Sequence, residues 1–598
     1  LTPTTAMSTA LMEHFGAAND PMTILRNARE ANLSDSAWKF AFPALGENLT
    51  PNLEALQHLC REAERKIMSA DVRESRDELL IVVQAGMGIG KSHLIDIADG
   101  LFFAGEKPLV LKVTYNKDQV LLAEQEGRQC LQGLLARLVV AAHRNVSPTC
   151  YALISDMQKK RELTVAEVGD FIIEEANDHP IIIGVDEVVM LSHDNKNLLR
   201  AIVNLLAQLV MHIRRHFKKC ICIITAVPSL DIRSVSNRPT LPLVLPALTV
   251  QQSRALLRSV LRDDGVSDGV SDEMLHEVHL SCGGHPRSLA VAATRMATGI
   301  KVGETKIPTT NDVYPDCKWS MAKEGTAFSA AEAITEMYNQ GVMRADKTTP
   351  EASILLGEAM MMETEARRHA IPPTVLFCDN ESDKALLEHA RLMFCPNDGV
   401  AAAKALEDIQ YHWDYFRRRR NMAILPPSMK RELIGGKSTS AQFFMFDHLK
   451  EVIADTILDS KTAVNREFME KGIDATRYYM PSHVSHPCFE SMCVASDDGG
   501  TKRTLVLFQS KINADVPAAV DGLTLAVTTL QSAKLWAGDF LFVIFALEHG
   551  GGGTTMKRCA HPIIFVNSEN LHKYFTPTLA PAAQLTLMRH KRLNCKSN

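Results

Sequence analysis

The chain has 598 residues, enough for about three to four domains, and its 46% hydrophobic content is ample for packed cores. No apolar run reaches the ~18 residues that a membrane helix requires, and residues 1–30 lack a basic start followed by an apolar segment. The sequence therefore predicts neither a membrane span nor a secretory signal. The net charge of −5 excludes a surface uniformly coated with base for nucleic acid, although short basic runs occur at 213–219, 416–421 and 588–592.

The first strong pattern is an apolar run, residues 79–84, that leads into a glycine-rich turn and a helix. The turn matches the phosphate-binding pattern G-x-x-x-x-G-K-[ST], with Ala85 in place of the first glycine. Its glycines let backbone N–H groups point at phosphate oxygens, while Lys91 would reach the β- and γ-phosphates and Ser92 would bind Mg²⁺. The predicted nucleotide-binding residues are Gly86, Gly88, Gly90, Lys91, Ser92 and His93.

Two further apolar strands supply polar groups at their ends. The run at 180–185 is followed by Asp186, expected to hold Mg²⁺, and Glu187, expected to orient or deprotonate the attacking water. The run at 220–226 ends near Thr225, a candidate contact to the γ-phosphate or the water. Cys220 and Cys222 alternate along this run, which predicts buried strand cysteines and not metal ligands.

The sequence favours ATP over GTP only by default. Residues 116–119 resemble a guanine-reading motif, but Gln119 stands where an aspartate is needed, and the segment precedes the acidic strand. A helix is expected over 250–263, and the break at 283–287 should start another, with Pro286 in its first turn. Arg287 at that start could fold back over phosphates from a helical lid.

Taken together, the motifs AGMGIGKS, VTYN, VDEVVML, TAVPS, LPALT and CGGHPRSL resemble the P-loop ATPase of the Crinkler and retrotransposon-hot-spot (RHS) proteins, which are allied to AAA+ and STAND ATPases. The resemblance covers about residues 70–300. It implies that Lys91 and Ser92 belong to the first nucleotide-binding motif, Asp186 and Glu187 to the second, Thr225 to a polar sensor and Arg287 to the lid. A ring-forming ATPase would also need an arginine acting in trans, for which Arg233 and Arg238 are available.

The middle of the chain is predicted to be mostly helical. Residues 300–325 are rich in turn formers and predict a linker or a crossing segment. Helices are expected over 329–343, 351–370, 383–394 and 399–421. Arg417–Arg420 end the last of these; they indicate either a nuclear-import or phosphate-backbone contact, or a solvated helix end.

Residues 440–598 change character. We expect a helix over 440–458, strands over 486–496 and 501–512 around a tight turn, a helix over 520–538, and strands over 539–547 and 561–566. An even-numbered hairpin loop would put Glu490 on the same face as Gln509 and Lys511, whereas an odd one would turn it away. Glu490 and Gln509 could then hold Mg²⁺, with Lys511 steadying a water or a developing phosphate charge.

That trio resembles the PD-(D/E)xK nuclease superfamily in its variants with glutamine. The usual strand aspartate is replaced by Glu490 or by Asp497 and Asp498 in the turn, and an upstream acid would be Glu451 or Asp455. An ordinary hairpin or a decayed nuclease is the alternative interpretation of the same residues.

The predicted architecture is an α/β P-loop NTPase with a helical lid, a mostly helical middle and a C-terminal mixed α/β, restriction-endonuclease-like domain. The expected divisions are 1–70, an N-terminal helical segment; 71–300, the ATPase with its lid; 301–430, linker and helices; and 431–598, the nuclease-like domain.

The leading functional hypothesis is an effector-type ATPase that uses ATP and Mg²⁺ to gate a metal-dependent nuclease acting on DNA, less readily on RNA. The alternative is a nucleotide-switched interaction protein whose C-terminal domain binds nucleic acid or chromatin proteins without cleaving. Either protein is expected to act in a nucleus or in the cytoplasm, and a secreted effector would act in the host nucleus. The expected partners are nucleic acid, host or nuclear proteins, and further copies of the chain.

Overall fold

A computed structural model provides the structure of the protein, which falls into two compact units: residues 1–246 with 356–359, and residues 247–355 with 360–598. The described residues are 50–69, 80–86, 88–115, 130–142, 162–188, 196–216, 219–226, 240–243, 245–266, 270–302, 307–317, 330–339, 362–363, 369–377, 384–394, 402–420, 422–423, 444–445, 451–454, 458–460, 463–464, 472–475, 477–480, 489–496, 502–511, 516–546 and 561–596.

The first unit is built on a five-stranded, all-parallel sheet with the order β2-β3-β4-β1-β5. The strands are β1 (Leu80–Gln84), β2 (Leu109–Thr114), β3 (Ile181–Asp186), β4 (Cys220–Ala226) and β5 (Thr240–Leu243). β3 and β4 are buried along their whole length, as expected for apolar, β-branched strands covered by helices on both faces. The buried strands predicted around the phosphate-binding turn are therefore confirmed.

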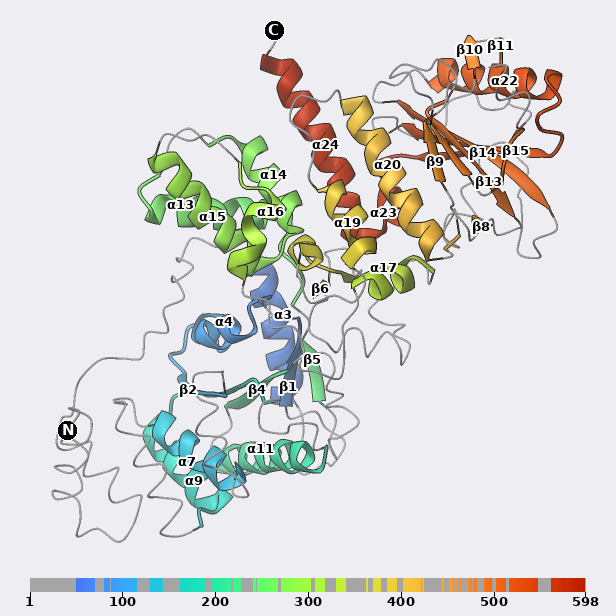
Figure 1. The fold of residues 1–598 in the computed structure, drawn as a ribbon. Coiled ribbons are helices and arrows are strands. Elements are labelled where there is room, and N and C mark those ends of the chain that lie inside the picture. Colours follow the sequence, from blue (N-terminus) through green and yellow to red (C-terminus); the bar gives the residue numbers. More distant parts are fainter. Residues whose placement is uncertain are drawn as a thin grey trace, which may run out of the picture. The chain divides into compact units, whose positions relative to one another are not determined.

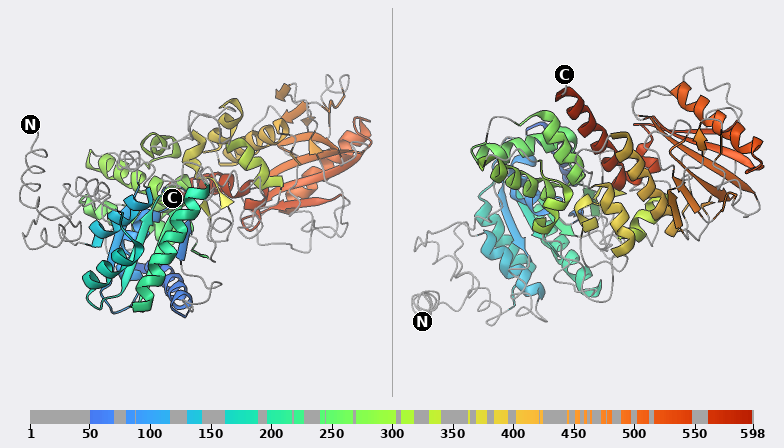
Figure 2. Two further views of the ribbon diagram at one scale, coloured as in Figure 1. Left: turned by 90° about the horizontal axis from the view of Figure 1, so that it is seen from below. Right: turned by 45° about the horizontal axis from the view of Figure 1, so that its top comes forward.

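Helices cover both faces of this sheet (Figure 1). One face carries α7 (Cys130–Ala142), α9 (Val165–Ala176) and α11 (Lys196–His216), and the other carries α3 (Thr50–Ser69), α4 (Lys91–Asp96) and α5 (Ala98–Leu101). The turned views in Figure 2 keep α7, α9 and α11 together along one side of the strands.

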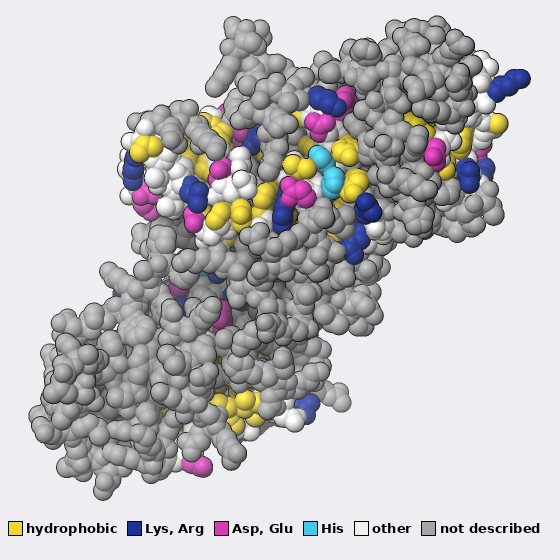
Figure 3. All heavy atoms as spheres, viewed as in Figure 1, with side chains coloured by type: hydrophobic (Ala, Val, Ile, Leu, Met, Phe, Trp, Pro, Cys, Tyr) yellow, Lys and Arg dark blue, Asp and Glu magenta, His cyan; other side chains and the backbone are white. Residues whose placement is uncertain are grey.

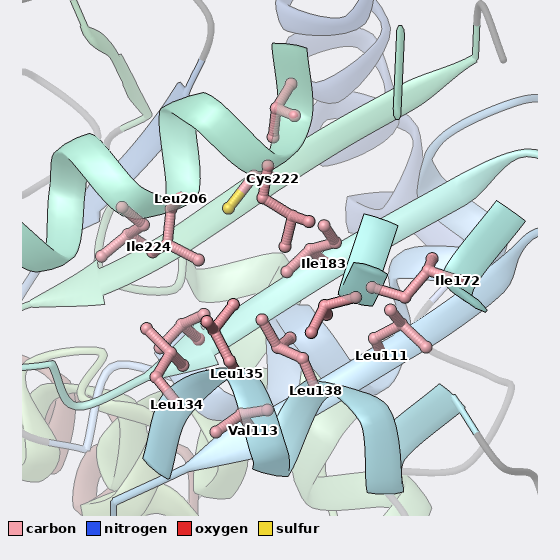
Figure 4. Packing of buried hydrophobic residues seen from close by; sticks show 14 of the residues in the cluster. Leu111, Val113, Leu134, Leu135, Leu138, Ile172, Ile183, Leu206, Cys222 and Ile224 are labelled. Atoms are coloured by element: carbon pink, nitrogen blue, oxygen red, sulfur yellow. The ribbon is translucent and has the colours of Figure 1, made fainter. Parts of the chain in front are cut away.

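The core between the sheet and the α7–α9–α11 layer is purely apolar at its centre (Figure 4). Leu135 and Leu138 of α7 and Leu206 of α11 meet Ile183 and Cys222 of the sheet there. Burial raises the pKa of the Cys222 thiol well above its ordinary value, so the group stays uncharged. The prediction of a buried strand cysteine is confirmed.

The strand order determines where a ligand can bind. The chain leaves β1 for the far edge at β2 and returns through β3 and β4 to β1, while β5 lies on the other side of β1. In parallel α/β sheets ligands bind beyond the carboxyl ends of the strands, where the order of connection reverses. The carboxyl end of β1 is such a point, and the glycine-rich turn begins there.

The second unit opens with three helices, in the stretch where a helical lid was predicted. They are α13 (Val250–Asp263), α14 (Asp272–Cys282) and α15 (Pro286–Lys301). Gly283 adopts φ 62° at the end of α14, and Pro286 occupies the first turn of α15. The predicted break between the two helices is confirmed.

One prediction for the middle was wrong, and the expected linker contains two short helical turns. Within the expected linker, Thr309 and Asp312 form a reciprocal capping box that starts α16 (Thr310–Val313), followed by a 3₁₀ turn, η3 (Tyr314–Cys317). Within the expected helix over 351–370, β6 (Met362–Glu363) pairs antiparallel with β7 (His369–Ala370). The predicted helices at 329–343, 383–394 and 399–421 correspond to α17 (Ala330–Asn339), α19 (Lys384–Met393) and α20 (Ala402–Arg419). A further 3₁₀ turn, η4 (Pro373–Phe377), precedes α19.

The C-terminal part contains a mixed sheet with the order β16-β15-β14-β13-β12-β9, to which β8 adds beside β13. The strands are β8 (Phe444–Met445), β9 (Glu451–Ala454), β12 (Arg477–Met480), β13 (Ser491–Ser496), β14 (Arg503–Lys511), β15 (Asp539–Ala546) and β16 (Ile563–Val566), and β10 (Leu458–Ser460) and β11 (Ala463–Val464) form a separate hairpin. The helix α22 (Val516–Ser532) packs on one face, and α23 (Leu571–Tyr574) and α24 (Thr576–Lys596) follow β16. The helix predicted over 440–458 was wrong, because β8 and β9 occupy that stretch.

None of the three basic runs is wholly a surface patch, because Arg214 and Arg417 are buried and Arg589 is half-buried. Arg214 donates to the Met68 carbonyl, and Arg589 lies 3.6 Å from the buried carboxylate of Glu277. Arg417 is fully buried and pairs with Asp414. For Arg417, both the import or phosphate-contact interpretation and the solvated helix end were wrong.

Among the described residues on the face drawn in Figure 3, acidic and basic side chains are interspersed, so this part carries no extended field of one sign. Within the described ranges no helix combines the length and apolar character needed to cross a membrane.

Candidate nucleotide site

The glycine-rich turn closes around the side chain of Lys91. The Nζ of Lys91 donates to the carbonyl oxygens of Ala85 and Gly86, at 2.9 Å each, and the side chain is 8% exposed. Gly88 and Gly90 adopt φ 78° and 106°, conformations that other residues rarely reach. The turn thus holds the lysine at the first residue of α4, where phosphate oxygens would meet both the ammonium group and the helix N-terminus.

The carboxylate of Asp186 lies beside the hydroxyl of Ser92. Ser92 Oγ donates to Asp186 Oδ2 at 2.6 Å, joining the start of α4 to the end of β3. Asp186 is 1% exposed. A hydroxyl at a helix start and a carboxylate at the neighbouring strand end are oxygen ligands of the type Mg²⁺ takes, so the residues present fit this ion.

Thr225 connects the two acidic residues. Its Oγ1 donates to Asp186 Oδ1 and accepts from the Glu187 backbone N–H at 3.0 Å. Glu187 has φ 55°, in the left-handed region that non-glycine residues seldom occupy. The structure therefore brings Ser92, Asp186, Glu187 and Thr225 together at the carboxyl ends of adjacent strands.

Sequence reasoning missed two supporting residues. Thr114, at the end of β2, directs Oγ1 at Asp186 Oδ2 over 3.4 Å, and its carbonyl accepts from Arg137 Nη1 at 3.0 Å. Arg137 comes from α7, is 5% exposed, and lies 4.4 Å from the centroid of the Tyr115 ring. The VTYN motif contains Thr114, but an arginine within an otherwise apolar helix was the available signal for Arg137.

Close packing beneath the turn depends on Gly184 in β3. A Cβ added there would lie 2.3 Å from Ile95 Cγ2 of α4. The glycine inside the apolar strand thus lets α4, and with it Lys91 and Ser92, approach β3.

The two remaining predicted contacts are less closely defined. His93 lies in α4, half-buried, and burial lowers its pKa, with Lys112 acting in the same direction and Asp96 opposing. Arg287 lies in the first turn of α15, in the second unit. Met87, Arg233 and Arg238 lie outside the described residues.

In the C-terminal sheet, the hairpin has the even register that the trio requires. Ser491 pairs with Phe508, and Glu490 accepts from Gln509 Nε2 at 2.7 Å and from the Ser510 backbone N–H. Gln509 is 1% exposed, and its Oε1 has no hydrogen-bond partner among the described residues. Lys511 is the last residue of β14.

None of the acids proposed to complete that trio is placed beside it in the described part of the chain. Glu451 lies in β9, which is separated from β14 by β12 and β13. Asp455, Asp497 and Asp498 lie outside the described residues. Among the residues that the structure does describe, no group of three histidine, cysteine, aspartate or glutamate side chains could hold a metal ion.

Comparison with known proteins gives only distant structural likenesses. No protein-family model and no curated protein sequence matches the chain. Among solved structures, the Holliday junction branch migration motor RuvB of Thermotoga maritima is 14% identical, with a TM-score of 0.27, over 57% of this chain and 94% of that one.

Two others are Cdc6p of Pyrobaculum aerophilum, 12% identical over 55% of this chain and 92% of that one, TM-score 0.29, and ORC2 of Aeropyrum pernix, 11% identical over 53% and 88%, TM-score 0.27. Likenesses at this level indicate neither activity nor partners. The parallel α/β sheet with its glycine-rich turn after β1 is the architecture of a P-loop NTPase, on the strand order and turn geometry described above.

Proposed function

We propose that the protein binds ATP with Mg²⁺ and hydrolyses it at the carboxyl end of β1. The observation that carries this proposal is the 2.6 Å contact between Ser92 Oγ and Asp186 Oδ2, one residue after Lys91 at the start of α4. In P-loop enzymes, Mg²⁺ is held by a serine or threonine of the P-loop and an aspartate at a strand end, and Ser92 and Asp186 are such a pair.

Each residue has a distinct role in this proposal. Lys91 and the N–H groups of the turn neutralise the β- and γ-phosphates, and Ser92 and Asp186 hold the ion or its water shell. Bound Mg²⁺ would withdraw charge from the phosphate oxygens. Glu187 orients or deprotonates the attacking water, and Arg287 is proposed as the lid contact to the phosphates.

The first test is ATP binding and turnover by purified wild-type protein and the Lys91→Ala variant. Loss of one charge-assisted contact to phosphate should raise the Kd for ATP by roughly 10- to 100-fold. Lys219→Ala is the matched control, because Lys219 immediately precedes β4 and pairs with Glu106 on the surface. Equal ATP affinity in all three proteins would contradict the proposed site.

A second candidate function is favoured by the pairing of Glu490 with Gln509. We propose that these two and Lys511 form a metal-dependent phosphodiesterase site acting on DNA, less readily on RNA, under control of the ATPase. The buried Oε1 of Gln509, which has no hydrogen-bond partner within the described part of the chain, supports it together with the adjacent Glu490 carboxylate. The runner-up is a C-terminal domain that binds nucleic acid or chromatin proteins without cleaving.

To decide between the nuclease and the non-cleaving binder, the protein is incubated with plasmid DNA or structured RNA and Mg²⁺, with and without ATP, and binding and cleavage are measured. The nuclease proposal expects cleavage that Lys511→Ala abolishes, Lys91→Ala alters and the exposed control Lys502→Ala leaves intact. Binding without cleavage by any of these proteins would favour the runner-up.

On the motif resemblance, we propose that the protein is a member of the Crinkler and RHS proteins and that it acts in the nucleus or cytoplasm. Nucleic acid, host or nuclear proteins and further copies of the chain are the proposed partners.

A further inference from the structure

The hydroxyl of Thr225 has no hydrogen left for a phosphate. Its one hydrogen is directed at Asp186 Oδ1, and a lone pair accepts the Glu187 N–H at 3.0 Å. Asp186 Oδ1 accepts the hydroxyl hydrogen, and the backbone N–H of Glu187 can only donate, so the Thr225 oxygen faces Glu187 as an acceptor. The side chain is 0% exposed.

The same contact bears on an unfavourable backbone conformation. A non-glycine residue in the left-handed region costs of order 1–3 kcal/mol unless its surroundings hold it. Glu187 has φ 55°, and its N–H has Thr225 Oγ1 as a partner. Thr225 lies opposite Val83 of β1 in a parallel ladder, so its position is fixed by the strand that leads into the phosphate-binding turn.

We propose that Thr225 is a positioning residue that acts on ATP hydrolysis through Asp186 and Glu187 and does not contact the γ-phosphate. The hydroxyl holds the aspartate that faces Ser92 and fixes the backbone that aims the Glu187 carboxylate. This inference rests on the proposed ATPase and replaces the expectation that Thr225 contacts the phosphate or the water.

Thr225→Val keeps the side-chain shape and removes the hydroxyl, whereas Thr225→Ser keeps the hydroxyl. Loss of a group that orients a metal ligand typically lowers activity by roughly 10- to 100-fold. We expect Thr225→Val to lower kcat by about that factor with KM for ATP changed less than about threefold, and Thr225→Ser to restore most of it. A comparison of melting temperatures in the presence of ATP separates a loss of kcat from a loss of fold.

Two readouts separate positioning from phosphate contact. A residue that contacts the γ-phosphate discriminates ATP from ADP, so its loss would change the ratio of the two Kd values; the proposal expects that ratio to stay within about twofold of wild type. In a double-mutant cycle with Glu187→Gln, the combined loss of kcat should be smaller than the product of the two single losses, because part of the effect of Thr225→Val passes through Glu187.

A changed ATP-to-ADP ratio, or additive losses in the cycle, would overturn the inference while leaving the ATPase intact. Absence of ATP turnover in the wild-type protein would instead overturn the proposed function itself.

Discussion

Asp186 shows how much of the site depends on single polar atoms. One carboxylate oxygen accepts from Ser92 and Thr114, and the other accepts from Thr225. The sequence predicted Ser92 and Asp186 because a phosphate-binding pattern and an acidic strand end each have a recognisable form. The link from Thr225 to the Glu187 N–H was beyond prediction, because it depends on the register of β3 and β4 and on a positive φ.

Arg417 is a second residue whose role the sequence obscured. Four consecutive arginines at a helix end suggested a solvated or ligand-binding run, but the guanidinium is enclosed by Asp414 and by the hydroxyls of Tyr338 and Tyr574, at 3.1 and 2.6 Å. Its partners come from three helices, so only the tertiary fold brings them together.

Arg417→Met should destabilise the second unit by about 3–5 kcal/mol, because it leaves the carboxylate of Asp414 buried without its partner. Arg419→Met, at an exposed position two residues on, should change the free energy of unfolding by less than about 0.5 kcal/mol. Denaturant unfolding measures both. Equal effects would mean that the buried pair adds nothing to stability.

His279 makes a pH prediction. Burial first, then the neighbouring His276 and Arg254, lower the pKa of His279 to about 4. The unfolded chain therefore binds one more proton than the folded one between about pH 6.5 and 4, and stability falls as the pH drops through this window, at up to about 1.4 kcal/mol per pH unit.

His279→Gln should remove that slope, because glutamine does not titrate. Unfolding free energies at several pH values between 4 and 7 measure it in both proteins. The same slope in wild type and variant would contradict the assignment to His279.

The helices and strands that could be predicted have apolar residues spaced with either the helical or the strand period, and clear signals at their ends. α13 matches its predicted bounds, with a capping box of Thr249 and Gln252 at its start. β13 and β14 match because a tight turn separates two apolar runs. The expected helix over 440–458 failed because strand pairing of β9 with β12 and of β8 with β13 outweighed a helical spacing of apolar residues.

The packing of α4 on β3 gives a prediction at this scale. Gly184→Ala should push α4 away from β3, because the new Cβ would overlap Ile95, and should lower stability by about 1–3 kcal/mol and weaken ATP binding. Ile95→Ala in the same chain should recover part of the ATP affinity by making room.

Gly100→Ala is the control, since an added Cβ there meets no atom within 4 Å. ATP titrations of these three variants and the wild type are compared. Equal binding by Gly184→Ala and Gly100→Ala would show that close helix–strand approach is not needed.

At the scale of the whole molecule, the first unit holds the candidate nucleotide-site residues other than Arg287, and the second holds the helices that follow β5 and the C-terminal sheet. Motifs predicted that Ser92, Asp186 and Thr225 lie together, because they mark strand ends that a parallel sheet brings to one edge. The division between the units could not be read from the sequence, since it depends on which helices bury which faces. α24, for instance, was not predicted, yet its Arg589 pairs with Glu277 of α14.

The measurement that tests the central claim most directly is single-turnover ATP hydrolysis by wild-type protein and Glu187→Gln, with ATP binding measured in parallel. The account predicts Mg²⁺-dependent hydrolysis by the wild type, and a variant that binds ATP as tightly but hydrolyses it roughly 10²- to 10⁴-fold more slowly, as expected for loss of a general base. Undiminished hydrolysis by Glu187→Gln, or ATP binding by the wild type without any turnover, would contradict it.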